Sequence, residues 1–180
     1  MLNKLKTLLK HLWLDASDTR RAIPPDMLQR LARRVAASER RHSGEIRICV
    51  EASLPLSYLW RLGKQNSIAA LTRQRAVTMF GKLRVWDTEH NNGVLIYVLL
   101  AERAIEIVAD RGLARHVGPD QWQALVARMA AAFREQRYED GLTQALEETS
   151  AVLMQHFAVD GSEEGAQARA NELPDAPLLQ

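Results

Sequence analysis

The stretch that most constrains the fold is an uninterrupted apolar run from Val94 to Leu100, which follows the polar segment 86–92. A run of this length without charge and without alternation is typical of a strand that is buried on both faces of a sheet. The dipeptide Asn92-Gly93 is a turn signal and marks where the strand begins. The sequence therefore predicts a central strand over 94–100.

A second β-rich stretch, residues 104–109, follows the first after the short break 101–103. Because so short a connection cannot hold a crossover, the two strands must form an antiparallel hairpin. The hairpin returns Asp110 to the end of the sheet where Asn91 and Asn92 lie. We therefore expect oxygen-bearing side chains to gather at this end of a rigid pair of strands.

The segment 45–51 alternates between apolar and polar residues, which predicts a half-buried strand near the edge of the sheet. A helix predicted over 66–83 separates it from the central strand, so the two strands should be parallel and joined right-handedly. Further helices are predicted between Pro24 and His42, over 119–134 and over 138–157. Gly44 is predicted to end the first of these helices in a left-handed conformation.

The 180 residues suffice for one domain with a core and flexible ends. We expect a basic amphipathic leader and connector over 1–23, a folded domain over 24–158 and a disordered acidic tail over 159–180. The tail prediction follows from its composition, which is dominated by Gly, Ser, Glu, Gln, Ala and Pro.

The leader carries Lys4, Lys6 and Lys10 among leucines and Trp13. This spacing predicts a short basic helix with one apolar face. Two interpretations stay open: the helix packs on the domain, or it docks on an anionic membrane surface.

Composition excludes several classes of function. A net charge of +2 and the absence of a Lys/Arg stripe interleaved with aromatics argue against a nucleic-acid partner. No run reaches the roughly 18 apolar residues of a spanning helix, so we expect no transmembrane segment. A single cysteine, Cys49, excludes an internal disulfide framework. These observations predict a cytoplasmic protein, with peripheral attachment at the inner membrane face as a hypothesis for the leader.

The candidate metal ligands are oxygen-bearing residues around the central hairpin: Asp87, Glu89, Asn91, Asn92 and Asp110. Carboxylate and amide oxygens suit a hard divalent cation, calcium or magnesium. The alternative is an Asx-rich turn that only starts a strand.

Two further residues are candidates for ligand contact at the same end. Trp86 is expected to pack as a lid over the loop or to stack on a ligand. Arg111 is expected to pair with Asp87 or to hold a phosphate. His90 and His116 flank this end as candidate acids or bases, but no catalytic residue is identified.

Several motifs, taken in order, resemble one known family. They are Gly44-Glu45-Ile46-Arg47, Asn91-Asn92-Gly93-Val94-Leu95-Ile96, Arg103-x-Ile105-Glu106-Ile107, Gly112-Leu113, Phe133-Arg134 and Tyr138-x-x-Gly141-Leu142. Over about residues 24–157 the chain resembles the TPM domain, also called the TPM phosphatase domain, and within it a soluble proteobacterial branch.

The resemblance implies an α/β fold: a three-layer α/β/α sandwich around a small mixed β-sheet, Rossmann-like in layout. It also implies a cleft that holds a divalent cation, calcium in some relatives. Acid phosphatase activity is claimed for plant thylakoid-lumen members, whereas other members look non-catalytic.

Two functions follow as hypotheses. The first is a divalent-cation-binding, non-catalytic interaction module that associates with a membrane complex, its partner being an unidentified protein or the membrane surface. The alternative is a weak metal-dependent acid phosphatase, in which a metal-activated water attacks the phosphate ester.

Overall fold

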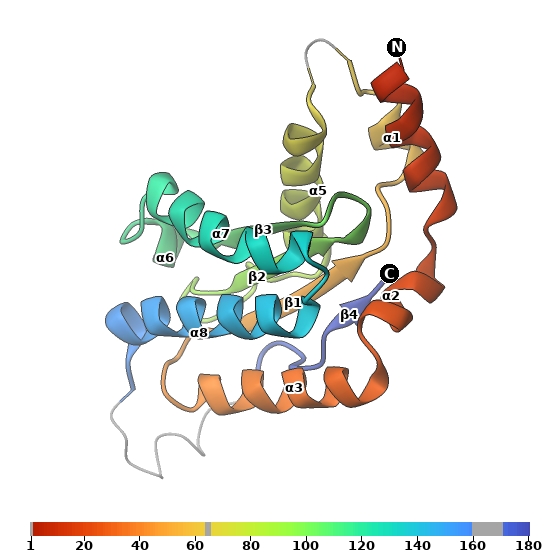
Figure 1. Cartoon of the computed structure of the whole chain (residues 1–180). Helices are drawn as coiled ribbons and strands as arrows, with labels where there is room; N and C mark the ends of the chain where they lie inside the picture. Colours follow the sequence, from red (N-terminus) through yellow and green to blue (C-terminus); the bar gives the residue numbers. More distant parts are fainter. Residues whose placement is uncertain (1, 64–65, 160–170) are drawn as a thin grey trace.

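The computed structural model describes residues 2–63, 66–159 and 171–180 (Figure 1). In chain order the elements are α1 (Leu2–Trp13), α2 (Ala16–Ala22), α3 (Pro25–Glu39), β1 (Ile46–Glu51), α4 (Leu56–Leu59), α5 (Ile68–Lys82), β2 (Val94–Leu99), η1 (Leu100–Glu102), β3 (Ala104–Ala109), α6 (Arg111–Ala114), α7 (Pro119–Arg134), α8 (Tyr138–Phe157) and β4 (Leu178–Leu179).

The strands form one mixed sheet in the order β3-β2-β1-β4. β1 runs parallel to β2 and to β4, and β2 runs antiparallel to β3, with Val94 opposite Ala109. Every residue of β2 is buried, as the unbroken apolar run predicts. The predicted parallel crossover and the antiparallel hairpin are both confirmed.

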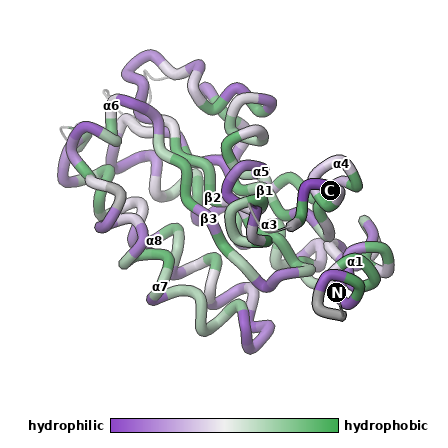
Figure 2. Tube along the Cα trace, turned by 90° about the horizontal axis from the view of Figure 1, so that it is seen from above, coloured by the Kyte–Doolittle hydropathy of each residue, from purple (hydrophilic) through white to green (hydrophobic). Residues whose placement is uncertain are grey.

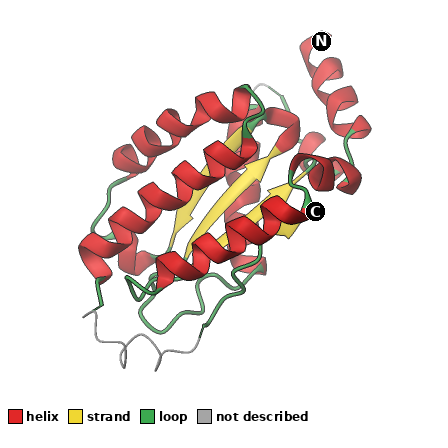
Figure 3. Ribbon diagram, turned by 60° about the horizontal axis from the view of Figure 1, so that its bottom comes forward, coloured by secondary structure: helices red, strands yellow, loops and turns green. Residues whose placement is uncertain are grey.

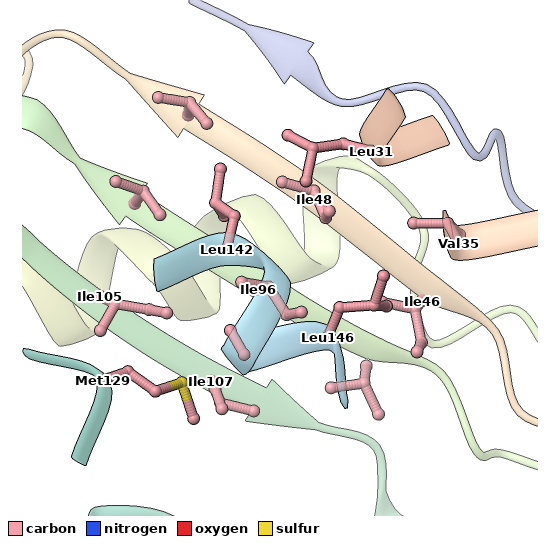
Figure 4. Close-up of a cluster of buried hydrophobic side chains, with 14 of the residues drawn as sticks. Leu31, Val35, Ile46, Ile48, Ile96, Ile105, Ile107, Met129, Leu142 and Leu146 are labelled. Carbon is pink, nitrogen blue, oxygen red and sulfur yellow. The ribbon is translucent and has the colours of Figure 1, made fainter. Parts of the chain in front are cut away.

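Helices cover both faces of the sheet, which confirms the predicted three-layer α/β/α sandwich. α3, α7 and α8 pack on one face, where Leu31, Met129 and Leu146 meet Ile48 and Ile96 (Figure 4). Figure 3 shows this layer of helices in front of the strands. α4 and α5 cover the other face with a second apolar cluster.

The prediction of a half-buried edge strand at 45–51 is wrong in one respect. All six residues of β1 are buried, because β4 pairs along the side that would otherwise be the sheet edge. The polar members of the alternation are buried with partners: the Arg47 guanidinium donates to the main-chain oxygens of Pro174 and Ala176. Polar–apolar alternation here marks two differently packed faces, neither of which meets water.

The prediction of a disordered tail is wrong for residues 171–180, while 160–170 lie outside the described residues. β4 pairs Leu178 and Leu179 with β1, and the Ala52 N–H donates to the Gln180 carbonyl at 2.9 Å. Leu173 is buried against the α5 side of the sheet. Main-chain hydrogen bonds, which composition does not report, hold this segment in place.

Gly44 does not take the predicted left-handed conformation. No described glycine has a positive φ, and α3 already ends at Glu39. A Cβ at Gly44 would fall against the side chain of Leu153 on α8. The glycine is needed there for close packing between the start of β1 and α8.

Candidate functional site

The loops at the start of β2 and the end of β3 are bound to each other by main-chain hydrogen bonds. The Asp110 N–H donates to Gly93 O, and the Gly112 N–H donates to Asn91 O, both at 2.9 Å. The Arg111 guanidinium donates from Nε to Asn91 Oδ1 at 2.8 Å. The structure thus brings Asn91, Asp110 and Arg111 into one corner, with Asn92 beside them.

Small residues make this approach possible. A Cβ at Gly112 would fall against the main-chain oxygens of His90 and Asn91, and one at Gly93 against the carbonyl of Val85. Asn91 itself has a φ of 53°, a left-handed conformation that asparagine tolerates better than most residues. Positions 93 and 112 therefore have no room for a side chain larger than that of glycine.

Two side-chain oxygens in this corner lack a partner among the described residues: Asn92 Oδ1 and Asp110 Oδ2, both buried. The other polar atoms of these side chains are occupied. Asn92 Nδ2 donates to Ser43 Oγ at 3.2 Å, and Asp110 Oδ1 accepts the Arg111 N–H at 2.7 Å. Buried polar atoms without partners are rare and costly, so these two oxygens are candidate acceptors for a hydrogen-bond donor or a cation.

The remaining predicted metal ligands do not join this corner. Asp87 is exposed and pairs with Arg84, whose Nη2 lies 3.0 Å from Asp87 Oδ2. Glu89 is exposed, and its main-chain N–H donates to the carboxylate of Glu172. Within the described ranges, no cluster of three or more His, Cys, Asp or Glu side chains is arranged to hold a metal ion. A cation here would rest on one carboxylate plus amide oxygens.

One predicted contact at this end is wrong, and the roles of the other candidate residues stay predictions. Arg111 does not pair with Asp87; Arg84, three residues before Asp87 in the turn that follows α5, takes that role. Trp86 is half-exposed. His90 is exposed, and His116 stacks on the ring of His156 with ring centroids 4.7 Å apart.

A buried polar cluster at the other end of the sheet contains Arg75 and Tyr97, which were not predicted as partners of Glu51. The carboxylate of Glu51 accepts hydrogen bonds from Arg75, at 2.8 Å to Nε, and from the Tyr97 hydroxyl at 2.6 Å. Burial raises the pKa of the Cys49 thiol to about 12, and the Glu51 charge adds to that shift. A thiol that stays protonated at neutral pH is a poor nucleophile, so we assign Cys49 no catalytic role. The contact between Arg75 of α5 and Glu51 of β1 holds the helix to the sheet.

The hairpin end also anchors α1. Glu102 accepts from Lys10 Nζ at 2.8 Å and from His11 Nε2 at 2.9 Å, and His11 Nδ1 accepts the Leu54 N–H at 3.0 Å. His11 is almost fully buried. The helix therefore contacts the domain through polar side chains, in addition to the apolar contact of Leu8.

The apolar stripe of α1 faces away from the domain. Leu5, Leu9, Leu12 and Trp13 recur at helical spacing on one side, and Leu12 and Trp13 are 61% and 83% exposed. Figures 1 and 3 show α1 at the margin of the molecule. In Figure 2 the helix carries apolar positions along its length. No helix among the described residues is long and apolar enough to cross a bilayer.

The chain is similar to one protein family and to two solved structures. A family model described as the TPM domain matches residues 16–152. The NMR structure of the BA42 protein from the psychrophilic bacterium Bizionia argentinensis has a TM-score of 0.68 and 22% sequence identity, covering 87% of this chain and 94% of that chain. The N-terminal domain of a protein from P. gingivalis, also solved by NMR, has a TM-score of 0.57 and 16% identity, covering 76% and 82%.

At these identities the two solved structures establish the common fold alone. No curated protein matches the chain. The family model covers most of the domain, from α2 to the last turns of α8. The motifs that suggested the family lie within that match, and the chain belongs to the TPM domain family.

Proposed function

We propose that this TPM domain is a non-catalytic interaction module that docks on an anionic membrane surface through α1 and binds a divalent cation between the β2 and β3 loops. The observation that carries the proposal is the outward orientation of the apolar stripe on α1. An amphipathic helix in a soluble domain normally turns its apolar side to the core. Here Leu8 and His11 meet the domain, whereas the stripe of Leu5, Leu9, Leu12 and Trp13 meets solvent.

Charge supports a lipid surface as the partner. Lys4 and Lys6 are exposed, and α1 has no acidic residue. Helices that lie in the membrane interface combine leucine and tryptophan on one side with lysine on the other. Each lysine close to an anionic leaflet contributes roughly 1 kcal/mol of attraction.

A second exposed apolar pair extends the same surface. Leu56 lies on α4 and Trp60 directly follows it, and both are exposed, Trp60 by 82%. α4 lies near α1, because Leu8 of α1 packs against the cluster that contains Leu54 and Leu59. Two separate elements therefore present tryptophan and leucine to solvent at one end of the molecule.

Vesicle flotation tests the membrane part of the proposal. We expect the protein to float with vesicles that contain phosphatidylglycerol and to remain behind with phosphatidylcholine alone. The double variant Leu9→Ser, Leu12→Ser should lose flotation. Met154→Ser, which removes an exposed apolar side chain from α8, is the matched control and should float normally. Equal flotation of the double variant and wild type contradicts the proposal.

The cation part rests on two buried oxygens that have no hydrogen-bond partner in the described part of the chain, Asn92 Oδ1 and Asp110 Oδ2. Oxygen ligands of this kind suit calcium, which accepts amide, carboxylate and main-chain oxygens in flexible geometry. When bound, the cation would neutralise the Asp110 carboxylate and hold the two loops together.

Calorimetric titration with calcium chloride and with magnesium chloride tests this part. We expect saturable heat with one of the two salts and none after Asp110→Asn, which keeps an oxygen to cap α6. Asp87→Asn should bind as wild type does, because Asp87 pairs with Arg84. The cation part fails if neither salt gives saturable heat, and the membrane part is unaffected by that result.

A further inference from the structure

A pocket of about 520 Å³ lies at the end of the sheet opposite the corner that Asn91 and Asp110 form. Leu100 and Ala101, which directly follow β2, line it together with side chains from α1, α2 and the turn between α7 and α8. Figure 1 shows α1 and α2 at the same end of the molecule as the turn between β2 and β3. In open α/β sheets, ligands bind in crevices outside the carboxyl ends of the parallel strands. The pocket lies at this position, because β1 and β2 run parallel and both end there.

Three cationic side chains line the pocket, and two of them already have acidic partners. Lys10 Nζ lies 2.8 Å from Glu102 Oε1. Arg21 Nη1 donates to Asp18 Oδ1 at 2.8 Å. Because each pair is close to neutral, neither leaves a full positive charge for a ligand.

Arg103 is the third of these cations and differs from the other two. Its Nη1 donates to the main-chain oxygen of Arg134 at 3.1 Å, and no carboxylate pairs with it in the part of the chain that the structure describes. A guanidinium has five N–H donors, so most of them stay available for a ligand. The pocket therefore offers one positive charge that no acidic side chain compensates.

The hydroxyl of Tyr138 is a second group that can contact a ligand. Tyr138 is half-buried at the start of α8, and its hydroxyl has no hydrogen-bond partner among the described residues. Burial raises the pKa of Tyr138 overall, while the charge of Arg103 acts to lower it, which indicates that the guanidinium lies near this side chain. A hydroxyl that stays protonated at neutral pH donates a hydrogen bond to an anion.

The backbone is strained at two residues that line the pocket. Arg103 has a φ of 49° and Gln136 a φ of 60°, a left-handed conformation that residues other than glycine rarely adopt. Strain of this kind clusters at ligand-binding sites, where the surrounding structure holds it in place. Here it lies on both sides of one pocket, in the turn before β3 and in the turn before α8.

The rest of the lining indicates the class of ligand. Leu14, Ala22, Leu100 and Ala101 are apolar, so the body of the ligand should be apolar as well. One uncompensated positive charge matches one negative charge, and the planar fork of a guanidinium fits a carboxylate with two parallel hydrogen bonds. A phosphate monoester, with a charge of about −1.5 to −2 at neutral pH, exceeds what Arg103 alone compensates.

We infer that this pocket binds a small organic monocarboxylate, whose carboxylate contacts the guanidinium of Arg103 and the hydroxyl of Tyr138. The apolar body of the ligand would lie against Leu100 and Ala101. The volume is within the range of about 300 to 1,000 Å³ that is usual for small-molecule sites. The site depends neither on membrane docking by α1 nor on a cation at Asp110.

The probe is 3-phenylpropanoate, which joins one carboxylate to an apolar body. We expect saturable shifts of the main-chain amide signals of Ala101, Arg103 and Gln136 in NMR spectra, with a Kd below about 1 mM. The neutral analogue 3-phenylpropanamide, which has nearly the same shape, should bind at least about tenfold more weakly because it lacks the charge. Phenyl phosphate should also bind more weakly than the carboxylate.

Two variants remove the proposed contacts one at a time. Arg103→Asn removes the guanidinium, and asparagine tolerates the left-handed backbone, so binding should weaken at least about tenfold. Tyr138→Phe removes the hydroxyl and keeps the ring that lies beside Phe133, so binding should weaken about threefold to tenfold. Arg84→Asn is the matched control, because Arg84 is exposed, has a φ of 55° and lies outside the pocket lining. It should bind the probe as wild type does.

The outcomes separate a carboxylate from other occupants. Absence of saturable binding of 3-phenylpropanoate, or undiminished binding in either pocket variant, overturns the inference. Equally tight binding of the neutral amide would mean that apolar contact alone holds the probe and would also overturn it. Tighter binding of phenyl phosphate would assign the pocket to a phosphate group instead. If Arg103→Asn does not fold, as judged by circular dichroism, Tyr138→Phe against wild type decides.

Discussion

Two amphipathic helices of this domain are oriented in opposite ways. α3 turns its apolar side to the sheet, where Leu31 and Val35 have no exposed surface. α1 turns most of its apolar residues to solvent and contacts the domain through Leu8, His11 and Lys10. The same kind of sequence pattern therefore serves two purposes in one chain.

This contrast indicates how an interaction helix can be recognised. Burying a leucine side chain contributes about 1.5 to 3 kcal/mol to folding. α3 gains this contribution from Leu31, whereas α1 gives up most of it at Leu12 and Trp13. A helix that is held in place by polar contacts keeps its apolar stripe available for a surface outside the molecule.

The largest expected effect comes from making the same change in both helices. Leu31→Ala should lower the free energy of unfolding by about 2 to 5 kcal/mol, because it leaves a cavity against the sheet. Leu12→Ala should change it by no more than about 0.5 kcal/mol. Urea unfolding followed by circular dichroism measures both. A large decrease in the free energy of unfolding of Leu12→Ala would mean that the apolar stripe of α1 stabilises the fold. The two helices would then not differ in the way described.

A smaller effect on stability is expected from Glu39, the last residue of α3. Burial raises the pKa of Glu39 to about 8, and the charges of Glu45 and Asp175 add to the shift. Because the folded state then binds a proton that the unfolded state releases above its ordinary pKa of 4.5, stability should fall as the pH rises from about 4.5 to 8.

Glu39→Gln tests this pH dependence. The variant removes the charge and keeps an oxygen that accepts the Ile46 N–H, a bond of 2.8 Å in the wild type. It should stabilise the protein by about 1 to 3 kcal/mol at pH 8.5 and much less at pH 5. Glu147→Gln, at an exposed position on α8, is the control. Equal stabilisation at both pH values would contradict the assignment.

The smallest effect concerns the contacts that hold α1. Although burial acts to raise it, hydrogen bonds from His11 and Lys10 lower the pKa of Glu102 overall. The contribution of these contacts should be complete above pH 4.5 and lost as the pH falls through the lowered pKa of the folded state.

Glu102→Gln should cost about 1 kcal/mol at neutral pH, since Lys10 is partly exposed and its ion pair is screened. Hydrogen exchange measured by mass spectrometry should become faster in peptides from α1 and stay unchanged in peptides from α3. Unchanged exchange in α1 would show that other contacts hold the helix.

The sequence predicted the sheet because its strands are marked by unbroken or β-rich apolar runs, and the short break at 101–103 allows only a hairpin. β4 was missed because Leu178 and Leu179 are too few for a pattern, and main-chain bonds and Arg47 hold that segment. The amphipathic character of α1 was visible, but its orientation was not. It depends on His11 meeting Glu102, 91 positions away.

The candidate site was predicted only in part for a related reason. Asn91, Asn92 and Asp110 were brought together by the hairpin, whose geometry follows from the chain itself. Asp87 pairs with Arg84 and does not join the corner. The spacing of residues in the sequence does not show which nearby charged side chain Asp87 contacts. Long-range side-chain partners, such as Arg75 for Glu51, leave no local signal in a single sequence.

Quenching of Trp13 fluorescence by brominated lipids tests the orientation of α1 most directly. Wild type and Trp13→Phe are each mixed with phosphatidylglycerol vesicles whose acyl chains carry bromine. We expect strong quenching in wild type and a clear loss of the quenched signal in Trp13→Phe, because Trp13 enters the acyl region, with the remaining quenching coming from Trp60 on the same surface. Equal quenching in the two proteins, or no quenching in either, would contradict the claim that the exposed stripe of α1 meets a membrane.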